Sequence, residues 1–265
     1  MPNNNSPEHN ERQPNLDKSN NDSSLNGFHG QYDFKIKDIL NRSYQLSAQN
    51  NWTIVLALMC IIALTFVIYI LYLHAFEITD FALLMTEESP LTQNQQAIIE
   101  LTLTVVLAPL WAGVAMLAIA TNRKESQSAL SIFEYYKMLP SLALASGFIS
   151  IFLTLGLALF FIPGFYIFTV TTFSLPLIAD KKMGPIKAIV CSTRMSNIYI
   201  WKMLQLYLIF LLMLFLVVVS FGIAYLWVGP LYFNAKAVLY QDLFCTKRAV
   251  EDQNNTNEKQ GLFDA

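Results

Sequence analysis

Charge is scarce in this sequence. Asp, Glu, Lys and Arg make up only 14% of its 265 residues, whereas ordinary soluble domains contain about 25%. The 17 basic residues are outnumbered by 19 acidic ones, so no basic domain is available to neutralise phosphates and we expect no nucleic-acid partner. Hydrophobic residues reach 54%. This composition is typical of a membrane protein.

Cysteine and histidine are also rare. Cys60, Cys191 and Cys245 have neither the spacing of a zinc site nor that of a disulfide framework. Two of the three histidines, His9 and His29, lie in a polar N-terminal segment. The HExxH, GxSxG and P-loop patterns and paired intramembrane aspartates are all missing. We therefore expect no metal, no cofactor and no catalytic residue, and a protein that is not an enzyme.

Polar segments enclose the apolar part of the chain. Residues 1–33 are rich in Asn, Ser, Pro and charge, and they predict a disordered cytoplasmic tail. They lack the basic start and apolar core of a cleaved signal peptide. Residues 245–265 predict a second cytoplasmic tail. The membrane domain is expected to cover residues 34–244.

The apolar stretches predict an all-α bundle of about six transmembrane helices. Residues 52–73 are long enough to cross a hydrocarbon core of about 30 Å, and residues 97–120 form a second span. Residues 139–179 are too long for one span, and Pro163-Gly164 is a turn signal that divides them. The resulting fourth span, residues 165–179, is short, and whether it crosses fully stays open.

The last apolar stretch, residues 203–244, also needs a break. A break at Gly229-Pro230 would leave a final segment too short and too polar to span. A break near Gly222 gives a full-length sixth helix, residues 223–244, in which Lys236 lies close enough to the end to snorkel. The sequence therefore favours the break near Gly222.

Basic residues indicate the orientation of the spans. All 17 Lys and Arg residues fall on one side of a six-span arrangement, and the connections at residues 74–96, Pro163-Gly164 and Gly222 contain none. The positive-inside rule places those three connections outside and both termini in the cytoplasm.

Three stretches on the cytoplasmic side predict short amphipathic helices that lie in the membrane interface: residues 34–47, 128–139 and 185–196. Each has apolar residues at intervals of three and four. Each precedes a span, so the sequence predicts a unit of one interfacial helix and one transmembrane hairpin that occurs three times. A serine at a fixed interval before a span supports this repeat, although chance is an alternative explanation: Ser43 before Trp52, Ser131 before Pro140 and Ser192 before Trp201. The apolar faces consist of Ile36, Ile39, Leu40 and Tyr44; Ala129, Ile132, Phe133 and Tyr136; and Ile186, Ile189, Val190 and Thr193.

Polar residues inside the predicted spans are the candidate functional residues. A lysine within a span, such as Lys236, costs about 2.5 to 3.5 kcal/mol on insertion scales unless it snorkels or is paired. Asp180 and Asp242 are its candidate partners, and a buried pair with Asp180 is one hypothesis. Asn234 and Tyr240 flank Lys236, and Tyr240 shares its helix face.

Glu100 is a further candidate, because it lies about one turn inside the second span. An ionised carboxylate at this depth would face a polar cavity or reach the interface. Reaching the interface is the simpler of these two alternatives for Glu100.

Motifs along residues 34–244 resemble one family. They are DILNRSYQLSAQNNW, YYKMLPSLALASG, FIPGFYI, PLIAD, AIVCSTRMSNIYIWK, and a final helix that contains GP and ends in AVLYQDLF. This order resembles the YciC-type bacterial inner-membrane proteins and is similar to the membrane domain of some glycerophosphodiester phosphodiesterases. The resemblance implies six spans in a bacterial cell membrane. It does not imply hydrolase activity, because no catalytic barrel follows Phe244.

Two functions are expected from these observations. The first is a non-enzymatic protein that acts in membrane or envelope homeostasis through membrane lipids, or through other membrane proteins or a second copy of itself. The second is a small transporter or lipid-handling protein. A water-accessible cavity lined by Glu100, Asn234 and Lys236 would favour the second, whereas a sealed apolar interior would favour the first.

Overall fold

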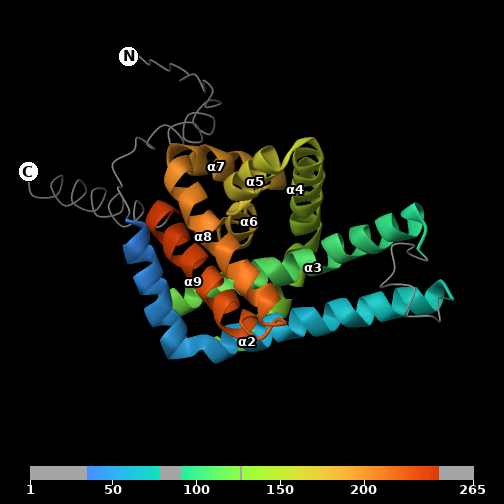
Figure 1. Cartoon of the computed structure of the whole chain (residues 1–265), viewed down its shortest axis with the longest axis horizontal. Coiled ribbons are helices and arrows are strands. Elements are labelled where there is room, and N and C mark those ends of the chain that lie inside the picture. The colour runs from blue at the N-terminus through green and yellow to red at the C-terminus, as the bar shows by residue number, and fades with distance from the viewer. Residues whose placement is uncertain (1–34, 78–90, 126, 245–265) are drawn as a thin grey trace, which may run out of the picture. The chain divides into compact units, whose positions relative to one another are not determined.

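The computed structural model describes residues 35–77, 91–125 and 127–244, with backbone alone at residues 49–51. The regular elements of this part are all helices, which confirms the predicted all-α bundle (Figure 1). The predicted tails, residues 1–33 and 245–265, lie outside it. The elements are α2 (Ile36–Ala75), α3 (Gln93–Asn122), the 3₁₀ helix η2 (Ala129–Met138), α4 (Leu139–Leu159), α5 (Phe161–Thr171), α6 (Ser174–Lys181), α7 (Pro185–Ile198), α8 (Ile200–Val219) and α9 (Tyr225–Phe244).

Five helical segments are long and apolar enough to cross a membrane, as in an integral membrane protein. The predicted sixth span, α9, is a 20-residue helix but does not reach the same hydropathy. Its second half carries Asn234, Lys236, Gln241 and Asp242. The five segments are Trp52–Ala75, Gln93–Asn122, Ala129–Leu159, Phe161–Lys181 and Ile200–Val219.

The helix breaks confirm one prediction and correct another. α8 ends at Val219 and α9 begins at Tyr225, so the break lies near Gly222 as predicted. The break after α4 comes earlier than predicted, at Phe160, where the backbone is extended. Pro163 then lies in the first turn of α5, where a missing N–H is tolerated because the first N–H groups of a helix have no helical partner.

The predicted span at residues 165–179 is not one continuous helix. Its residues belong to α5 and α6, which are separated at Thr172 and Phe173. Pro176 lies near the start of α6, where it needs no backbone donor.

The amphipathic helices form, but their buried faces differ from the predicted ones. In α7 the buried residues include Ala188, Cys191 and Ser192, whereas Ile186 and Val190 of the predicted face are exposed. α7 thus packs through small side chains, and its apolar stripe faces away from the bundle, where lipid could cover it.

The 3₁₀ geometry explains the difference in η2. Ile132 is fully buried, but Phe133 is exposed, because three residues per turn place Ile132 and Tyr135 on one side. The first predicted amphipathic helix is the beginning of α2. It buries Ile39 and Ser43 and exposes Tyr44, and it points in a different direction from the rest of α2 (Figure 1).

α3 is the central helix of the bundle. It contacts α2, η2, α4, α6 and α9. Its buried half, which begins at Leu107, is rich in alanine. Small residues let helix backbones approach closely, as is common in membrane bundles. α3 begins at a capping box, in which Thr92 and Gln95 exchange hydrogen bonds.

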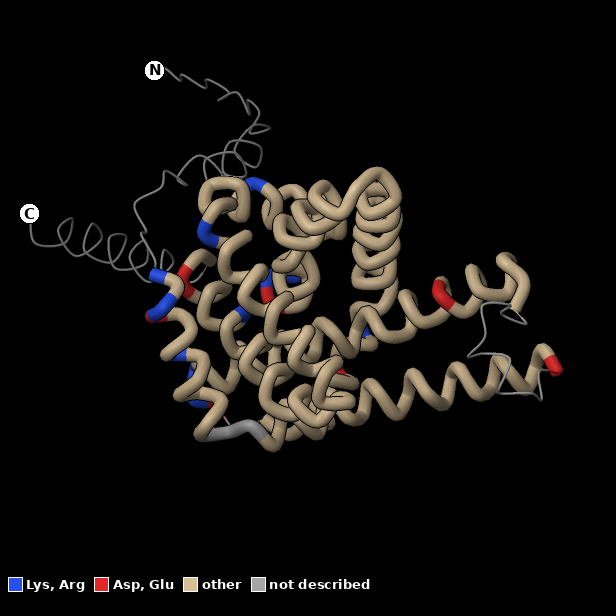
Figure 2. Tube along the Cα trace, viewed as in Figure 1, with Lys and Arg blue, Asp and Glu red and all other residues tan. Residues whose placement is uncertain are grey.

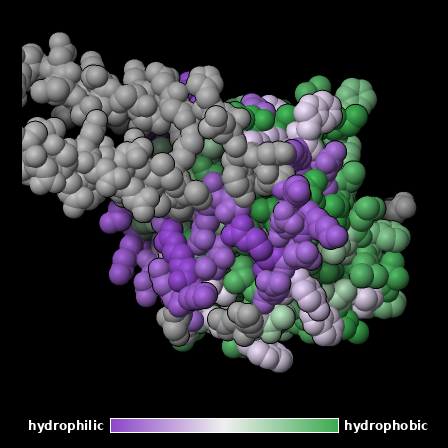
Figure 3. Space-filling view, turned by 90° about the vertical axis from the view of Figure 1, so that its left-hand side faces the viewer, coloured by the Kyte–Doolittle hydropathy of each residue, from purple (hydrophilic) through white to green (hydrophobic). Residues whose placement is uncertain are grey.

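Described Lys and Arg residues lie at the start of α2, at the ends of α3 and α6, and along η2, α7, α8 and α9 (Figure 2). The far ends of α2 and α3 carry acidic residues instead, Glu77 and Glu100. Seen from the basic side, hydrophilic side chains cover a broad area next to apolar surface (Figure 3). The ends of α2 and α3 that carry Glu77 and Glu100 thus have no described Lys or Arg.

Candidate functional site

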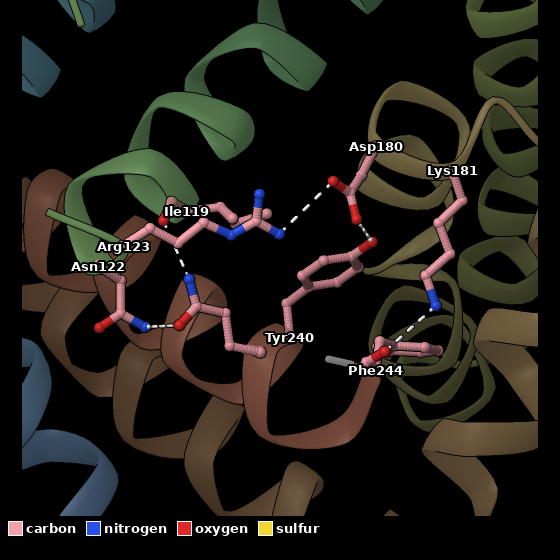
Figure 4. Close-up of polar contacts among 8 residues, drawn as sticks. Ile119, Asn122, Arg123, Asp180, Lys181, Tyr240 and Phe244 are labelled. Carbon is pink, nitrogen blue, oxygen red and sulfur yellow. Dashed lines mark hydrogen bonds and ion pairs between the residues drawn. The ribbon is translucent and has the colours of Figure 1, made fainter. Parts of the chain in front are cut away.

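Polar side chains meet where α3, α6 and α9 end. We call this group the helix-end cluster; α3 contributes Asn122 and Arg123 beside its end, and the side chains point toward one another (Figure 4). α6 contributes Asp180 and Lys181, and α9 contributes Tyr240 and Gln241.

Asp180 lies at the centre of this cluster. The Tyr240 hydroxyl donates a hydrogen bond of 2.8 Å to Oδ2 of Asp180. Oδ1 of the same carboxylate lies 3.6 Å from Nη2 of Arg123. Both oxygens of the Asp180 carboxylate thus face a donor group.

The other members satisfy backbone carbonyls at helix ends. Nε2 of Gln241 donates to the Ile119 carbonyl at 3.0 Å, and its Oε1 accepts from Asn122 at 2.6 Å. The Lys181 ammonium donates to the Phe244 carbonyl at 3.3 Å and lies 5.3 Å from the centre of the Phe244 ring. The last carbonyls of a helix lack helical partners. The helix-end cluster therefore joins the ends of three helices.

The helix-end cluster contains two of the predicted site residues, Tyr240 and Asp180. A third, Asp242, forms an ion pair of 2.9 Å with Arg42, which joins α9 to the first part of α2. The predicted pairing of Lys236 with Asp180 or Asp242 is wrong, because Asp180 faces Arg123 and Tyr240, and Asp242 faces Arg42.

The remaining three candidates form no hydrogen bond or ion pair with one another. Asn234 is fully buried and donates to Oγ of Ser47 at 2.9 Å. Glu100 is exposed, on the half of α3 that precedes the core. Lys236 is partly exposed, and its ammonium has no hydrogen bond or ion pair with the described residues. None of the three lines the groove between α3, α4, α5, α8 and α9.

A second polar group lies at the break between α5 and α6, and Ser192 of α7 holds it together. The Ser192 hydroxyl donates to the Val170 carbonyl at 2.7 Å and accepts from the Phe173 N–H at 3.2 Å. Thr172 and Tyr207 share a hydrogen bond of 2.9 Å beside it. These side chains replace the bonds that the break removes, which a bilayer requires because it supplies no water.

Cys191, next to Ser192, is buried. Burial raises the pKa of its thiol, and a thiol with a raised pKa forms less of the reactive thiolate. It is a packing residue of α7. Among the described residues no group of three His, Cys, Asp or Glu side chains could hold a metal ion.

An open groove of about 450 Å³ lies between α3, α4, α5, α8 and α9. No charged side chain lines it. Aromatic rings make up most of its wall, and they pack on one another; the rings of Phe210 and Tyr232 meet edge to face at 5.3 Å. The lining residues are Trp111, Leu153, Leu157, Phe161, Gly164, Phe165, Phe168, Tyr207, Phe210, Leu211, Leu214, Tyr225, Val228, Gly229, Tyr232 and Phe233.

Sequence reasoning missed this groove and several members of the helix-end cluster. Arg123 and Lys181 follow predicted spans, where a basic residue in the sequence indicates only orientation. The run Tyr240-Gln241-Asp242 was a usable signal, because three polar residues in the last turn of a buried helix need partners. The groove left no signal, since its residues look like ordinary span residues.

No protein-family model, curated protein or solved structure matches this chain. The resemblance to the YciC-type proteins stays a prediction.

Proposed function

We propose that this chain is a multi-pass protein of a bacterial cell membrane that binds membrane lipid in its groove and catalyses no reaction. The apolar, aromatic wall of the groove is the observation that supports this proposal. Its volume, about 450 Å³, falls within the usual range of ligand pockets, about 300–1,000 Å³. An acyl chain is the ligand that such a wall fits, because it needs neither a charge nor a hydrogen bond.

Lys236 supplies the contact for a headgroup. Tyr232 lines the groove, and Lys236 follows it by four residues on α9, so the two side chains lie on one helix face. The ammonium of Lys236 has no described partner. An anionic headgroup beside Lys236 would supply the counter-charge that the protein lacks there. The proposed ligand is an anionic phospholipid, with one acyl chain in the groove.

Lipid binding is favoured over transport of a polar solute. A polar pathway predicts a cavity lined by Glu100, Asn234 and Lys236, whereas none of these residues lines the groove. The groove is apolar but open, so the interior is not sealed either. A role in membrane or envelope homeostasis through lipids agrees with this arrangement.

For the orientation, we propose that both termini lie in the cytoplasm. The gathering of Lys and Arg at one side of the described bundle supports this, because basic residues are retained on the cytoplasmic side (Figure 2). A reporter fused after Ala265 should be cytoplasmic, and one inserted near Thr86 should be external. A cytoplasmic signal from the Thr86 insertion would reverse the proposal for this hairpin.

Photo-crosslinking tests the groove. The protein is reconstituted in phosphatidylethanolamine and phosphatidylglycerol, with a small fraction of phosphatidylglycerol that carries a diazirine in one acyl chain. We expect crosslinks to concentrate on the groove peptides of α5 and α9. Val228→Phe, which fills the groove, should reduce these crosslinks severalfold.

The control is Val218→Phe, an equal increase in volume on an exposed part of α8 that does not line the groove. It should leave the crosslinks in place. Equal labelling of every exposed apolar helix, with no difference between the two variants, would contradict a lipid site.

A further inference from the structure

The turn between α8 and α9 has an almost wholly apolar exterior. Phe221 is 97% exposed, and Ile223 and Trp227 are each 66% exposed. No charged residue occurs between Lys202 and Lys236. A turn that ends in water normally exposes Asn, Asp, Ser or Gly. The exterior of this turn has the composition of a surface that faces hydrocarbon.

The backbone of the turn provides its own hydrogen-bond acceptors. Every N–H group from Ser220 to Val228 donates to an acceptor within the chain. The Phe221 N–H donates to the Val218 carbonyl at 3.1 Å, and the Gly222 N–H to the Val217 carbonyl at 2.8 Å. Such internal pairing is what hydrocarbon requires, since no water is present to accept a hydrogen bond.

The side chain of Ser220 also forms its hydrogen bonds within the turn. Its hydroxyl donates to the Val217 carbonyl at 3.0 Å and accepts from the Ala224 N–H at 3.0 Å. The single hydroxyl in the turn is therefore occupied by the turn itself and is not turned toward solvent.

Two residues of the turn have left-handed backbone conformations. Phe221 has φ of 51° and Gly222 has φ of 88°. A non-glycine residue in the left-handed region is usually Asn or Asp, whose short polar side chains bond locally. Here a large apolar side chain occupies that position and is almost fully exposed.

The connection between α2 and α3 differs from the α8–α9 turn, because the residues on either side of it are polar. Its described ends carry Glu77, Thr92, Gln93 and Asn94. The first turn of α3 is capped by a polar side chain, that of Thr92. These are the features of a connection that reaches water.

We infer that the α8–α9 turn ends within the hydrocarbon of the bilayer. α8 is long enough to cross the hydrocarbon core, so the turn lies in the outer part of that core and the α8–α9 hairpin does not emerge into water on the far side. The partner of the turn is the acyl chains of the surrounding lipid. Tyr225 and Val228 follow the turn and line the groove, which places the groove mouth at hydrocarbon depth. The inference does not depend on lipid binding in the groove, because it rests on the turn alone.

Collision measurements on a nitroxide spin label test this inference. Cys60, Cys191 and Cys245 are replaced by alanine, Phe221→Cys is introduced and labelled, and the protein is reconstituted in phosphatidylethanolamine and phosphatidylglycerol. Oxygen concentrates in hydrocarbon, whereas a nickel chelate stays in water. We expect the label to collide severalfold more often with oxygen than with the chelate.

Gln93→Cys, at the start of α3, is the matched control and should favour the nickel chelate. Chelate collisions at residue 221 as frequent as at residue 93 would place the turn in water. Slow collisions with both reagents would show that protein covers the turn, and both results overturn the inference. Phe221 is almost fully exposed, so its replacement removes little packing; Ile223→Cys gives a second reading at a neighbouring exposed position.

Discussion

Gly113 and Ile132 bring the backbones of α3 and η2 into direct contact: a Cβ atom on residue 113 would lie 2.7 Å from the Cα atom of Ile132. No Cβ atom fits at that distance, and the obstacle is backbone, which cannot rotate away. We expect Gly113→Ala to lower the free energy of unfolding by about 1–3 kcal/mol, the usual cost of overpacking. Thermal unfolding in detergent measures this.

Gly147→Ala in α4 is the matched control. Nothing lies within 4 Å of a Cβ atom at that position. The change should leave stability the same or raise it by up to about 1 kcal/mol, because alanine favours helix. Equal effects at the two glycines would show that α3 and η2 do not approach as closely as described.

Ser192 and Ser196 supply a second matched pair, because both are buried on α7. Ser192 bonds to the break between α5 and α6, whereas the Ser196 hydroxyl has no hydrogen-bond partner in the described part of the chain. Ser192→Ala would leave the Phe173 N–H without an acceptor and should cost about 1–3 kcal/mol of stability. Ser196→Ala should cost little or nothing. Chemical unfolding followed by circular dichroism compares them; a larger loss from Ser196→Ala would contradict this account.

The helix breaks show what the sequence can and cannot predict. The break near Gly222 is predictable from a glycine and from the length and polarity of the segments on either side of it, all of which are features of the local sequence. The break at Thr172 and Phe173 has no local signal, because β-branched and aromatic residues fit a continuous helix. It depends on Ser192, about twenty residues later in the chain, and such a contact exists only in the folded bundle.

The helix-end cluster is predictable only in part, because its contacts join helices that are distant in the sequence. Tyr240 and Asp180 drew attention as polar residues near apolar helices. Their contact requires the ends of α6 and α9 to meet, and hydropathy does not say which spans are neighbours. The pairing of Arg123 with Asp180 could not be predicted, because a basic residue at a span end is expected from orientation alone.

Tyr240→Phe tests the helix-end cluster, since it removes only the hydroxyl that bonds to Asp180. A hydrogen bond to a charged group contributes about 1.5–3 kcal/mol, and we expect a loss of that size. Arg123→Gln should cost less, about 0–1 kcal/mol, because the guanidinium is 3.6 Å away and its side chain is 35% exposed. A double-mutant cycle of Tyr240→Phe with Asp180→Asn, measured by thermal unfolding, should show coupling. Additive losses would contradict a direct bond.

Lys236→Met tests the proposed lipid contact, because it should reduce lipid binding without lowering the stability of the protein. The Lys236 ammonium has no partner among the described residues, so its removal strands no carboxylate and should leave stability unchanged or raise it. Combination with Asp180→Asn should be additive, because Asp180 is held by Tyr240 and Arg123. Native mass spectrometry after reconstitution in phosphatidylethanolamine and phosphatidylglycerol should show severalfold less retained phosphatidylglycerol, with phosphatidylethanolamine unchanged. Lys182→Met removes an exposed cation and should not have this effect. An equal loss in both variants would mean that net charge, and not a site at Lys236, retains the anionic lipid.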